Sequence, residues 1–187
     1  MKFSLPSTSV CYIRLVSVVY FACPRLAVMD LIYKLAVNCL PPVHQAKLNT
    51  LLNCFSHDSE CTYNVNAYSY AYVCQHNSQY IAVLLVKENH TPTKNVHEVV
   101  TLCVDPKHRK KGHAKQLMQE FVANTPQNET AMVQLDATAP TYQAQQHFFD
   151  MFGFKILQSD TPCDARNDKH TNRIVQMQLS QEACVSL

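Results

Sequence analysis

The sequence predicts an α/β protein: a single three-layer domain in which helices flank a mixed, mostly antiparallel central sheet. The chain has 187 residues, which suits one domain, and 47% of them are apolar, enough for one sizeable core. Alternating segments in the first half indicate antiparallel hairpins, whereas a strand, helix, strand order in the centre indicates a parallel crossover. We therefore expect residues 1–187 to form one domain.

The N-terminal third is expected to form one strand and two helices. Val10–Tyr20 is rich in β-branched and aromatic side chains, which favours a strand. Pro41 and Pro42 separate two stretches of helical periodicity, so helices are predicted over about Arg25–Cys39 and Val43–Phe55.

Three strands are expected to follow as an antiparallel meander. Aromatic or apolar residues alternate with small ones over Tyr68–Tyr72 and again over Ile81–Leu85, and His76–Gln79 between them has the composition of a turn. A polar loop, Asn89–Asn95, leads to a third strand over Val96–Val104, which an Asp-Pro pair ends.

The remainder of the chain alternates helices with strands. From Ala114 to Val122, apolar residues recur at i, i+3, i+4, i+7 and i+8, the stripe of a helix packed on a sheet. The other predicted elements are strands over Met132–Ala137, Phe154–Leu157 and Val175–Leu179, and a helix over Tyr142–Phe152.

Composition narrows the classes of partner. Sixteen basic and 14 acidic residues leave a net charge of +2, so no overall field draws the protein to nucleic acid or to a membrane. The most apolar N-terminal run, Val10–Met29, contains Arg14, Pro24 and Arg25, which argues against a membrane span or a signal peptide. We expect a cytoplasmic protein with neither nucleic-acid nor membrane partners; the sequence does not indicate an oligomeric state.

The number and spacing of the cysteines also indicate a cytoplasmic protein. The nine cysteines show no C-x-x-C pair and no Cys/His spacing typical of zinc sites, and their odd number argues against a disulfide framework. A reducing cytoplasm suits such a set. Asp164, Asp168 and His170 lie in a polar stretch that is expected to be a loop between the last two strands, so no metal site is predicted.

Glycine is unusually rare, which draws attention to its positions. Average usage predicts about 13 glycines in a chain of this size, and this one has two, Gly112 and Gly153. Gly112 lies between a predicted strand and a predicted helix, in a segment with the basic residues Arg109, Lys110, Lys111 and Lys115. Unpaired N–H groups at a helix start and nearby cations together bind anions. The segment therefore favours a phosphate site over a solvated basic loop or a nucleic-acid contact.

The same residues resemble the acetyl-CoA loop of the GNAT N-acetyltransferase superfamily. The family pattern Arg/Gln-x-x-Gly-x-Gly/Ala reads Arg109-x-x-Gly112-x-Ala114 here, and the Val-x-Pro that often precedes it reads Val104-Asp105-Pro106. The family's aromatic residue followed by Gly-Phe matches Phe152-Gly153-Phe154. The resemblance covers about residues 96–157 and implies the acyl-CoA N-acyltransferase fold, with acetyl-CoA as co-substrate.

The resemblance also implies which residues form the site. The pantetheine arm would pair with the backbone of Leu102, Cys103 and Val104, and the pyrophosphate would lie on Arg109, Lys110, Lys111, Gly112, His113, Ala114 and Lys115. An amine acceptor with a pKa near 10.4 is almost fully protonated at neutral pH, so transfer needs a base. Glu98 has the position of the catalytic glutamate in the histone-acetyltransferase branch, and it is the expected base.

Two positions depart from the family pattern. Many relatives have a tyrosine that protonates the departing CoA thiolate four residues before the glycine of Gly-Phe, where this chain has Phe149. A frequent asparagine near the start of the same helix is also missing, with Tyr142 and Gln143 in that place. His97 is expected to be structural and Cys103 to pack as a small hydrophobe.

The sequence therefore predicts an enzyme, an N-acetyltransferase that transfers the acetyl group of acetyl-CoA to a primary amine. The acceptor is left open between a small molecule, a protein N-terminus and a lysine side chain. The alternative is a catalytically silent acyl-CoA-binding or protein-interaction domain of the same fold.

Overall fold

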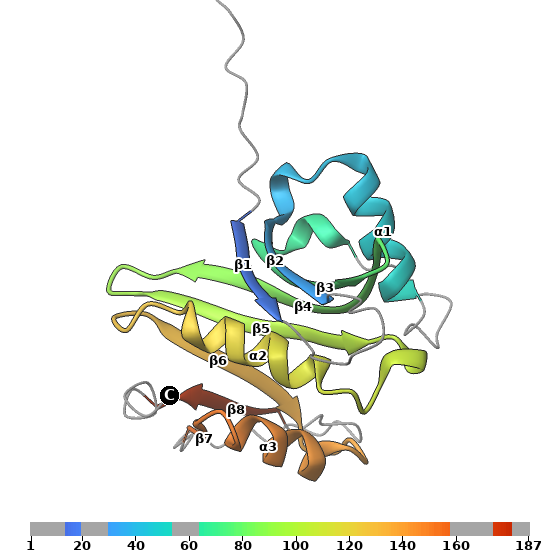
Figure 1. Ribbon diagram of the computed structural model, residues 1–187. Helices are drawn as coiled ribbons and strands as arrows, with labels where there is room; N and C mark the ends of the chain where they lie inside the picture. Colours follow the sequence, from blue (N-terminus) through green and yellow to red (C-terminus); the bar gives the residue numbers. More distant parts are fainter. Residues whose placement is uncertain (1–13, 20–29, 54–63, 158–173, 181–187) are drawn as a thin grey trace, which may run out of the picture.

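The computed structural model describes residues 14–19, 30–53, 64–157 and 174–180, which form one eight-stranded sheet with helices on both faces (Figure 1). The strands are β1 Arg14–Val19, β2 Asp30–Ala36, β3 Tyr70–His76, β4 Gln79–His90, β5 Asn95–Val104, β6 Thr130–Asp136, β7 Phe154–Ile156 and β8 Ile174–Leu179. The helices are α1 Pro42–Asn53, α2 His113–Ala123 and α3 Tyr142–Asp150, and short 3₁₀ turns occupy Val37–Cys39, Val65–Ala67 and Pro106–His108.

The sheet is mixed and mostly antiparallel, as predicted. Its order is β1-β2-β3-β4-β5-β6-β8-β7, and every neighbouring pair is antiparallel except β5 and β6. That parallel pair is the one joined through a helix, α2, because a parallel connection has to cross over a face of the sheet.

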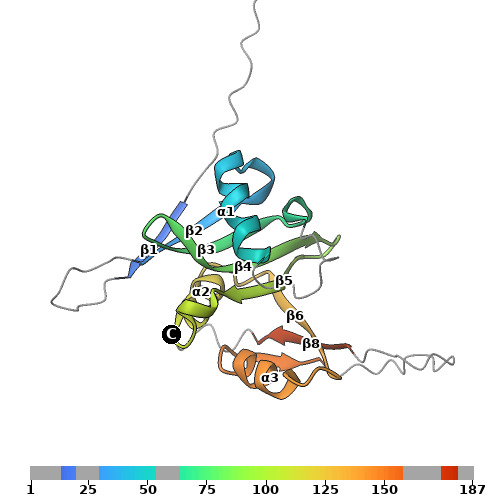
Figure 2. The same ribbon diagram turned by 90° about the vertical axis from the view of Figure 1, so that its right-hand side faces the viewer.

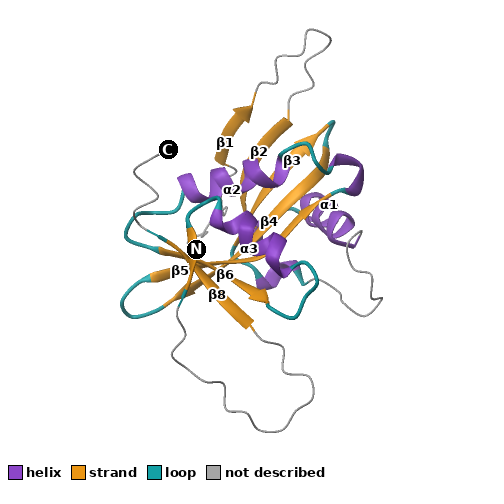
Figure 3. Ribbon diagram, turned by 90° about the horizontal axis from the view of Figure 1, so that it is seen from below, coloured by secondary structure: helices purple, strands orange, loops and turns teal. Residues whose placement is uncertain are grey.

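Helices cover both faces of the sheet and so form three layers with it (Figure 2). A hydrophobic cluster lies on each face, between the sheet and the helices. On one face, α1 packs through Leu48, Leu51 and Leu52. On the other, α2 and α3 cover a larger cluster that contains Phe121 from α2 and Phe149 from α3 (Figure 3). Strands β3 and β4, between the two clusters, are buried along most of their length.

The predicted helix over Arg25–Cys39 is wrong where the structure describes it. Residues 30–36 form β2, which pairs with β1 and β3, and only Val37–Cys39 turn as a 3₁₀ helix. Ile32 and Leu35 are both buried and three residues apart, a spacing typical of a helix face. In the strand they point to opposite faces, Ile32 toward the α2 cluster and Leu35 toward the α1 cluster, because helices cover both.

Most other predicted elements are confirmed to within a few residues. The β3–β4 hairpin turns at Asn77 and Ser78, whose φ angles of 47° and 65° are those of a tight two-residue turn. The loop predicted at Asn89–Asn95 is shorter, because β4 extends to His90 and β5 begins at Asn95. Asp164, Asp168 and His170 lie outside the described residues.

Strand β5 carries the irregularity that shapes the site. Leu85 of β4 is opposite Thr101 and Val86 is opposite Val99, so Val100 is an extra residue, a β-bulge. On its other edge, β5 pairs with β6 only from Val96 to Val99. Beyond this point the strands separate, so one backbone edge of residues 100–104 has no neighbouring strand within the part of the chain that the structure describes.

Candidate functional site

The segment between β5 and α2 forms a well-anchored loop. The Asp105 N–H donates to the Ile81 carbonyl at 2.8 Å, and an Asp105 side-chain oxygen accepts from the Lys107 N–H at 2.8 Å. After the turn at Pro106–His108, Lys110 and Gly112 have φ angles of 61° and 88°. The left-handed conformation at Gly112 explains the glycine there, because other residues adopt it only with strain.

The N-terminus of α2 is open to a ligand. Gly112 is the N-cap and provides no side-chain hydrogen bond to the helix, and the first turn contains no acidic residue. A Cβ built at Gly112 would meet no atom within 4 Å. The first N–H groups of a helix have no partners within it and lie at the positive end of its dipole. An anion can therefore approach these donors closely.

A groove leads from this helix end to the gap between β5 and β6. It consists of two pockets of about 470 and 450 Å³, which share the side chains of Leu102 and Phe148. The first pocket is lined by Leu102, Cys103, Val104, His108, Arg109, Lys110, Gly112, His113, Ala114, Lys115 and Phe148. The second lies between residues 99–102 of β5 and residues 133–136 of β6, beside α3. The arrangement suits an elongated ligand with an anionic end.

Nine of the ten residues predicted to bind a cofactor line the first pocket, and Lys111 is the exception. The Val104 carbonyl accepts a hydrogen bond from Nε of Arg109 at 3.2 Å, which ties the basic loop to the strand edge. Burial raises the pKa of the Cys103 thiol to about 11, and nearby Arg109 only partly opposes this. The thiol is therefore protonated at neutral pH, which does not favour a nucleophilic role.

Two residues of the first pocket were missed by the sequence analysis. His108 lies inside the predicted loop but has no place in the motif. Phe148 comes from α3, and its contact with Phe149 and Phe152 depends on how that helix packs. No local pattern distinguishes such a lining residue from an ordinary core aromatic.

The predicted base, Glu98, lies on β5 and lines neither pocket. Its neighbour Val99 belongs to the α2 cluster, so Glu98 faces the opposite side of the sheet, where α1 packs. The side chain is half-buried and accepts a hydrogen bond from Asn89 Nδ2 at 3.3 Å. Lys87 is its cross-strand partner on β4.

Phe149 lies where the sequence analysis noted a missing tyrosine. It is 7% exposed, lines the second pocket, and packs against Phe148 and Phe154. An apolar ring in that position gives the pocket no proton donor. Tyr142, half-buried against the same cluster, lines neither pocket.

A second polar group surrounds His97, which is buried as expected of a structural residue. Its Nδ1 is 2.9 Å from the Tyr70 hydroxyl, and its Nε2 is hydrogen-bonded to the Glu129 carboxylate. The bond from His97, and a second from Asn95, lower the pKa of Glu129, whereas burial raises that of Tyr70. Both ring nitrogens are therefore engaged in joining the starts of β3, β5 and β6.

The fold is that of the acyl-CoA N-acyltransferases. The family model described as "Acetyltransferase (GNAT) family" matches residues 29–154, so the chain belongs to this family. A search by sequence finds no curated protein that matches. In the described residues, no helix is both long and apolar enough to cross a bilayer.

Solved structures support the same fold at low sequence identity. Naa50 of Arabidopsis thaliana, in complex with the bisubstrate analogue CoA-Ac-MVNAL, is 12% identical with a TM-score of 0.57, over 80% of this chain and 98% of that one. The ribosomal-protein-S18-alanine N-acetyltransferase of Escherichia coli is 12% identical with a TM-score of 0.51, over 79% and 92%. ElaA of Escherichia coli is 15% identical with a TM-score of 0.55, over 81% and 100%.

Proposed function

We propose that this protein is an acetyl-CoA-dependent N-acetyltransferase that acylates a primary amine, with residues 1–187 as one domain acting in the cytoplasm. One observation carries the proposal: two neighbouring pockets, which share the lining residues Leu102 and Phe148, lie at the uncapped N-terminus of α2 and at the gap between β5 and β6. The first pocket offers hydrogen-bond donors and positive charge to an anion, which fits the pyrophosphate of acetyl-CoA. The second pocket offers an apolar slot, which fits its acyl arm.

In this proposal, two kinds of group hold the pyrophosphate. The N–H groups of Gly112, His113 and Ala114 point from the helix start, and Arg109 and Lys115 line the same pocket with positive charge. Lys110 lines it too, while Lys111 adds charge from outside the lining. Because a Cβ at Gly112 would project into open space, the absent side chain leaves room for the phosphate oxygens.

The unpaired edge of β5 receives the pantetheine amides. Leu102, Cys103 and Val104 lie beyond the last β5–β6 pair at Val99, so backbone groups on that edge have no strand beside them. Amide groups of an extended ligand satisfy such an edge as an added strand would. The acyl end then reaches the second pocket, between Val99 and Leu102 of β5 and Leu135 of β6.

The acceptor amine approaches from the α1 face of the sheet, where Glu98 lies. The nitrogen forms a bond to the acetyl carbonyl carbon, the carbon–sulfur bond breaks, and CoA leaves as a thiolate. Glu98 takes the proton that the amine loses, and the Asn89 amide holds the carboxylate in position. With Phe149 in the second pocket, solvent water protonates the thiolate.

The runner-up, a catalytically silent acyl-CoA-binding domain, is favoured by one observation, the apolar Phe149 in the second pocket. The two functions differ in their response to Glu98→Gln. For an enzyme, this variant loses at least about 100-fold in turnover and retains its affinity for acetyl-CoA.

The experiment measures CoA release from acetyl-CoA with a panel of amines: a free peptide N-terminus, a lysine-containing peptide and a polyamine. Glu120→Gln, the same change on the distal part of α2, is the matched control and should behave as wild type. Turnover that Glu98→Gln leaves unchanged would exclude Glu98 as the base. No turnover with any amine, despite acetyl-CoA binding, would favour the silent domain.

A further inference from the structure

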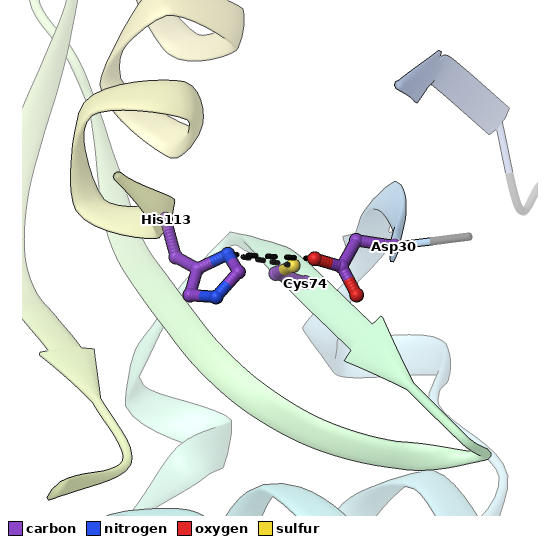
Figure 4. A group of neighbouring side chains, drawn as sticks. All are labelled: Asp30, Cys74 and His113. Atoms are coloured by element: carbon purple, nitrogen blue, oxygen red, sulfur yellow. Dashed lines mark hydrogen bonds and ion pairs between the residues drawn. The ribbon is translucent and has the colours of Figure 1, made fainter. Parts of the chain in front are cut away.

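A thiol, a carboxylate and an imidazole converge beside the first turn of α2 (Figure 4). Asp30 begins β2, Cys74 lies on the adjacent strand β3, and His113 is the first residue of α2. One potential ligand atom from each of these residues lies within 4.8 Å of the other two. Cys74 is 1% exposed and His113 is 4% exposed, so the group is largely enclosed.

The distances are close to those of a metal site. His113 Nδ1 is 3.8 Å from Cys74 Sγ and 3.8 Å from an Asp30 carboxylate oxygen. In a tetrahedral zinc site, with metal–ligand bonds of 2.0 to 2.3 Å, neighbouring ligand atoms are about 3.3 to 3.6 Å apart. A contraction of a few tenths of an ångström would bring the His113 nitrogen to that separation from the other two atoms, and the Cys74 sulfur lies within 4.8 Å of the Asp30 ligand oxygen.

The ligand types suit a divalent cation in the centre. An imidazole nitrogen, a thiolate sulfur and a carboxylate oxygen are the groups that bind zinc-type ions in proteins. The thiol loses its proton when such an ion binds, and the thiolate and the carboxylate together neutralise the charge of the ion within the buried site.

Outer partners that would orient two of the three ligands are also present. The second oxygen of Asp30 accepts a hydrogen bond from His76 Nδ1 at 2.7 Å. His113 Nε2 and Gln116 Oε1 are both buried, and the Gln116 side chain lies next to His113, but among the described residues neither atom forms a hydrogen bond of ordinary geometry. If Nδ1 binds a metal, the ring proton is on Nε2 and can be donated to Gln116, which satisfies both atoms.

A second group of potential ligands consists of Glu88, His97 and Glu129, but its histidine has no nitrogen free for a metal ion. Both nitrogens of His97 already form hydrogen bonds, to Tyr70 and to Glu129, so no ligand atom is left over. In the Asp30, Cys74 and His113 group, by contrast, the His113 Nδ1 atom has only the long 3.8 Å contacts with Cys74 Sγ and an Asp30 oxygen among the described residues.

We propose that Asp30, Cys74 and His113 bind a divalent transition-metal ion of the zinc type, with His76 and Gln116 as outer partners. The three protein ligands leave a fourth position for water or for another side chain. His108 is the nearest candidate, since its ring centroid is 5.4 Å from that of His76 and 6.3 Å from that of His113.

The site would connect the sheet to the groove. His113 and His108 both line the first pocket, so a metal ion bound to His113 would fix the start of α2 against β2 and β3. The proposal stands without the acetyltransferase assignment, because metal binding is measured in the absence of acetyl-CoA.

The test is a titration of the reduced, metal-free full chain with Co²⁺, followed by displacement with Zn²⁺. We expect the absorption of tetrahedral Co²⁺ with a thiolate-to-cobalt charge-transfer band, release of a proton on binding, and a higher melting temperature with Zn²⁺. Cys74→Ser should abolish the charge-transfer band, whereas Cys39→Ser, at an exposed cysteine, should retain it.

Two more variants make the result independent of how Cys74→Ser folds. Asp30→Asn keeps an oxygen for His76 but removes the charge, so it should weaken Co²⁺ binding. His76→Phe keeps an aromatic ring but has no donor for the outer hydrogen bond, so it should weaken Co²⁺ binding by about 10- to 100-fold. Equal charge-transfer bands in wild type and in folded Cys74→Ser would place the ion at other cysteines and overturn the proposal. Absence of the tetrahedral spectrum in the wild type would overturn it as well.

Discussion

Replacing Gly112 with alanine tests the conformation of the phosphate loop without filling the groove. The φ angle of 88° lies in the left-handed region, where a residue with a Cβ is less stable by about 1 to 2 kcal/mol. Because a Cβ there would meet no atom within 4 Å, no steric cost is added. Alanine also reduces the conformational entropy of the unfolded chain, which stabilises the folded state by about 0.4 to 1 kcal/mol. The expected net decrease in the free energy of unfolding is therefore about 1 kcal/mol.

For a domain of this size, a loss of about 1 kcal/mol lowers the melting temperature by roughly 2 to 4 °C. Calorimetry or spectroscopy measures this difference in melting temperature between Gly112→Ala and wild type. Gly112→Asn is the matched control, because asparagine tolerates the left-handed region better than alanine and should lose less stability. If Gly112→Ala is at least as stable as wild type and Gly112→Asn is less stable than Gly112→Ala, residue 112 does not have a left-handed conformation.

Two further predictions concern the second pocket and the His97 network. Phe149→Tyr should raise kcat by up to about 100-fold, because it places a proton donor for the leaving thiolate in the pocket, and Tyr142→Phe should leave kcat unchanged. If Phe149→Tyr does not raise kcat, protonation of the thiolate does not limit the reaction. The lowered pKa of Glu129 stabilises the fold above the ordinary value of 4.5, and this stability is lost as pH falls through the folded-state pKa. The difference in melting temperature between wild type and Glu129→Gln should therefore shrink as pH falls below about 4.5, and a difference independent of pH would contradict the ion pair with His97.

The sequence predicted the parts of the site that are local along the chain. Gly112 stood out because glycine is so rare here, and the strand before it and the helix after it are long and strongly periodic. The motif therefore identified nine of the residues that line the first pocket. The β-bulge at Val100 was not predicted, because no residue type marks the extra position.

The parts that were missed depend on contacts between distant segments. β2 was predicted as a helix because both of its faces are covered, so Ile32 and Leu35 do not show the alternation of a half-exposed strand. Spacing rules found no metal site, since Cys74 and His113 are 39 residues apart in the chain. Antiparallel pairing of β2 with β3, and the packing of α2 on them, bring these ligands together.

The central claim is that acetyl-CoA binds at the N-terminus of α2, and calorimetric titration of the purified protein with acetyl-CoA tests it most directly. Gly112→Glu places a carboxylate where the pyrophosphate is expected, Gly112→Ala repeats the backbone strain without the charge, and Gln119→Glu adds an acid on the exposed side of the same helix. We expect micromolar binding by wild type and by Gln119→Glu, weaker but measurable binding by Gly112→Ala, whose methyl group takes part of the space left for the phosphate oxygens, and loss of binding by Gly112→Glu. Binding by Gly112→Glu as tight as that of wild type would contradict the account.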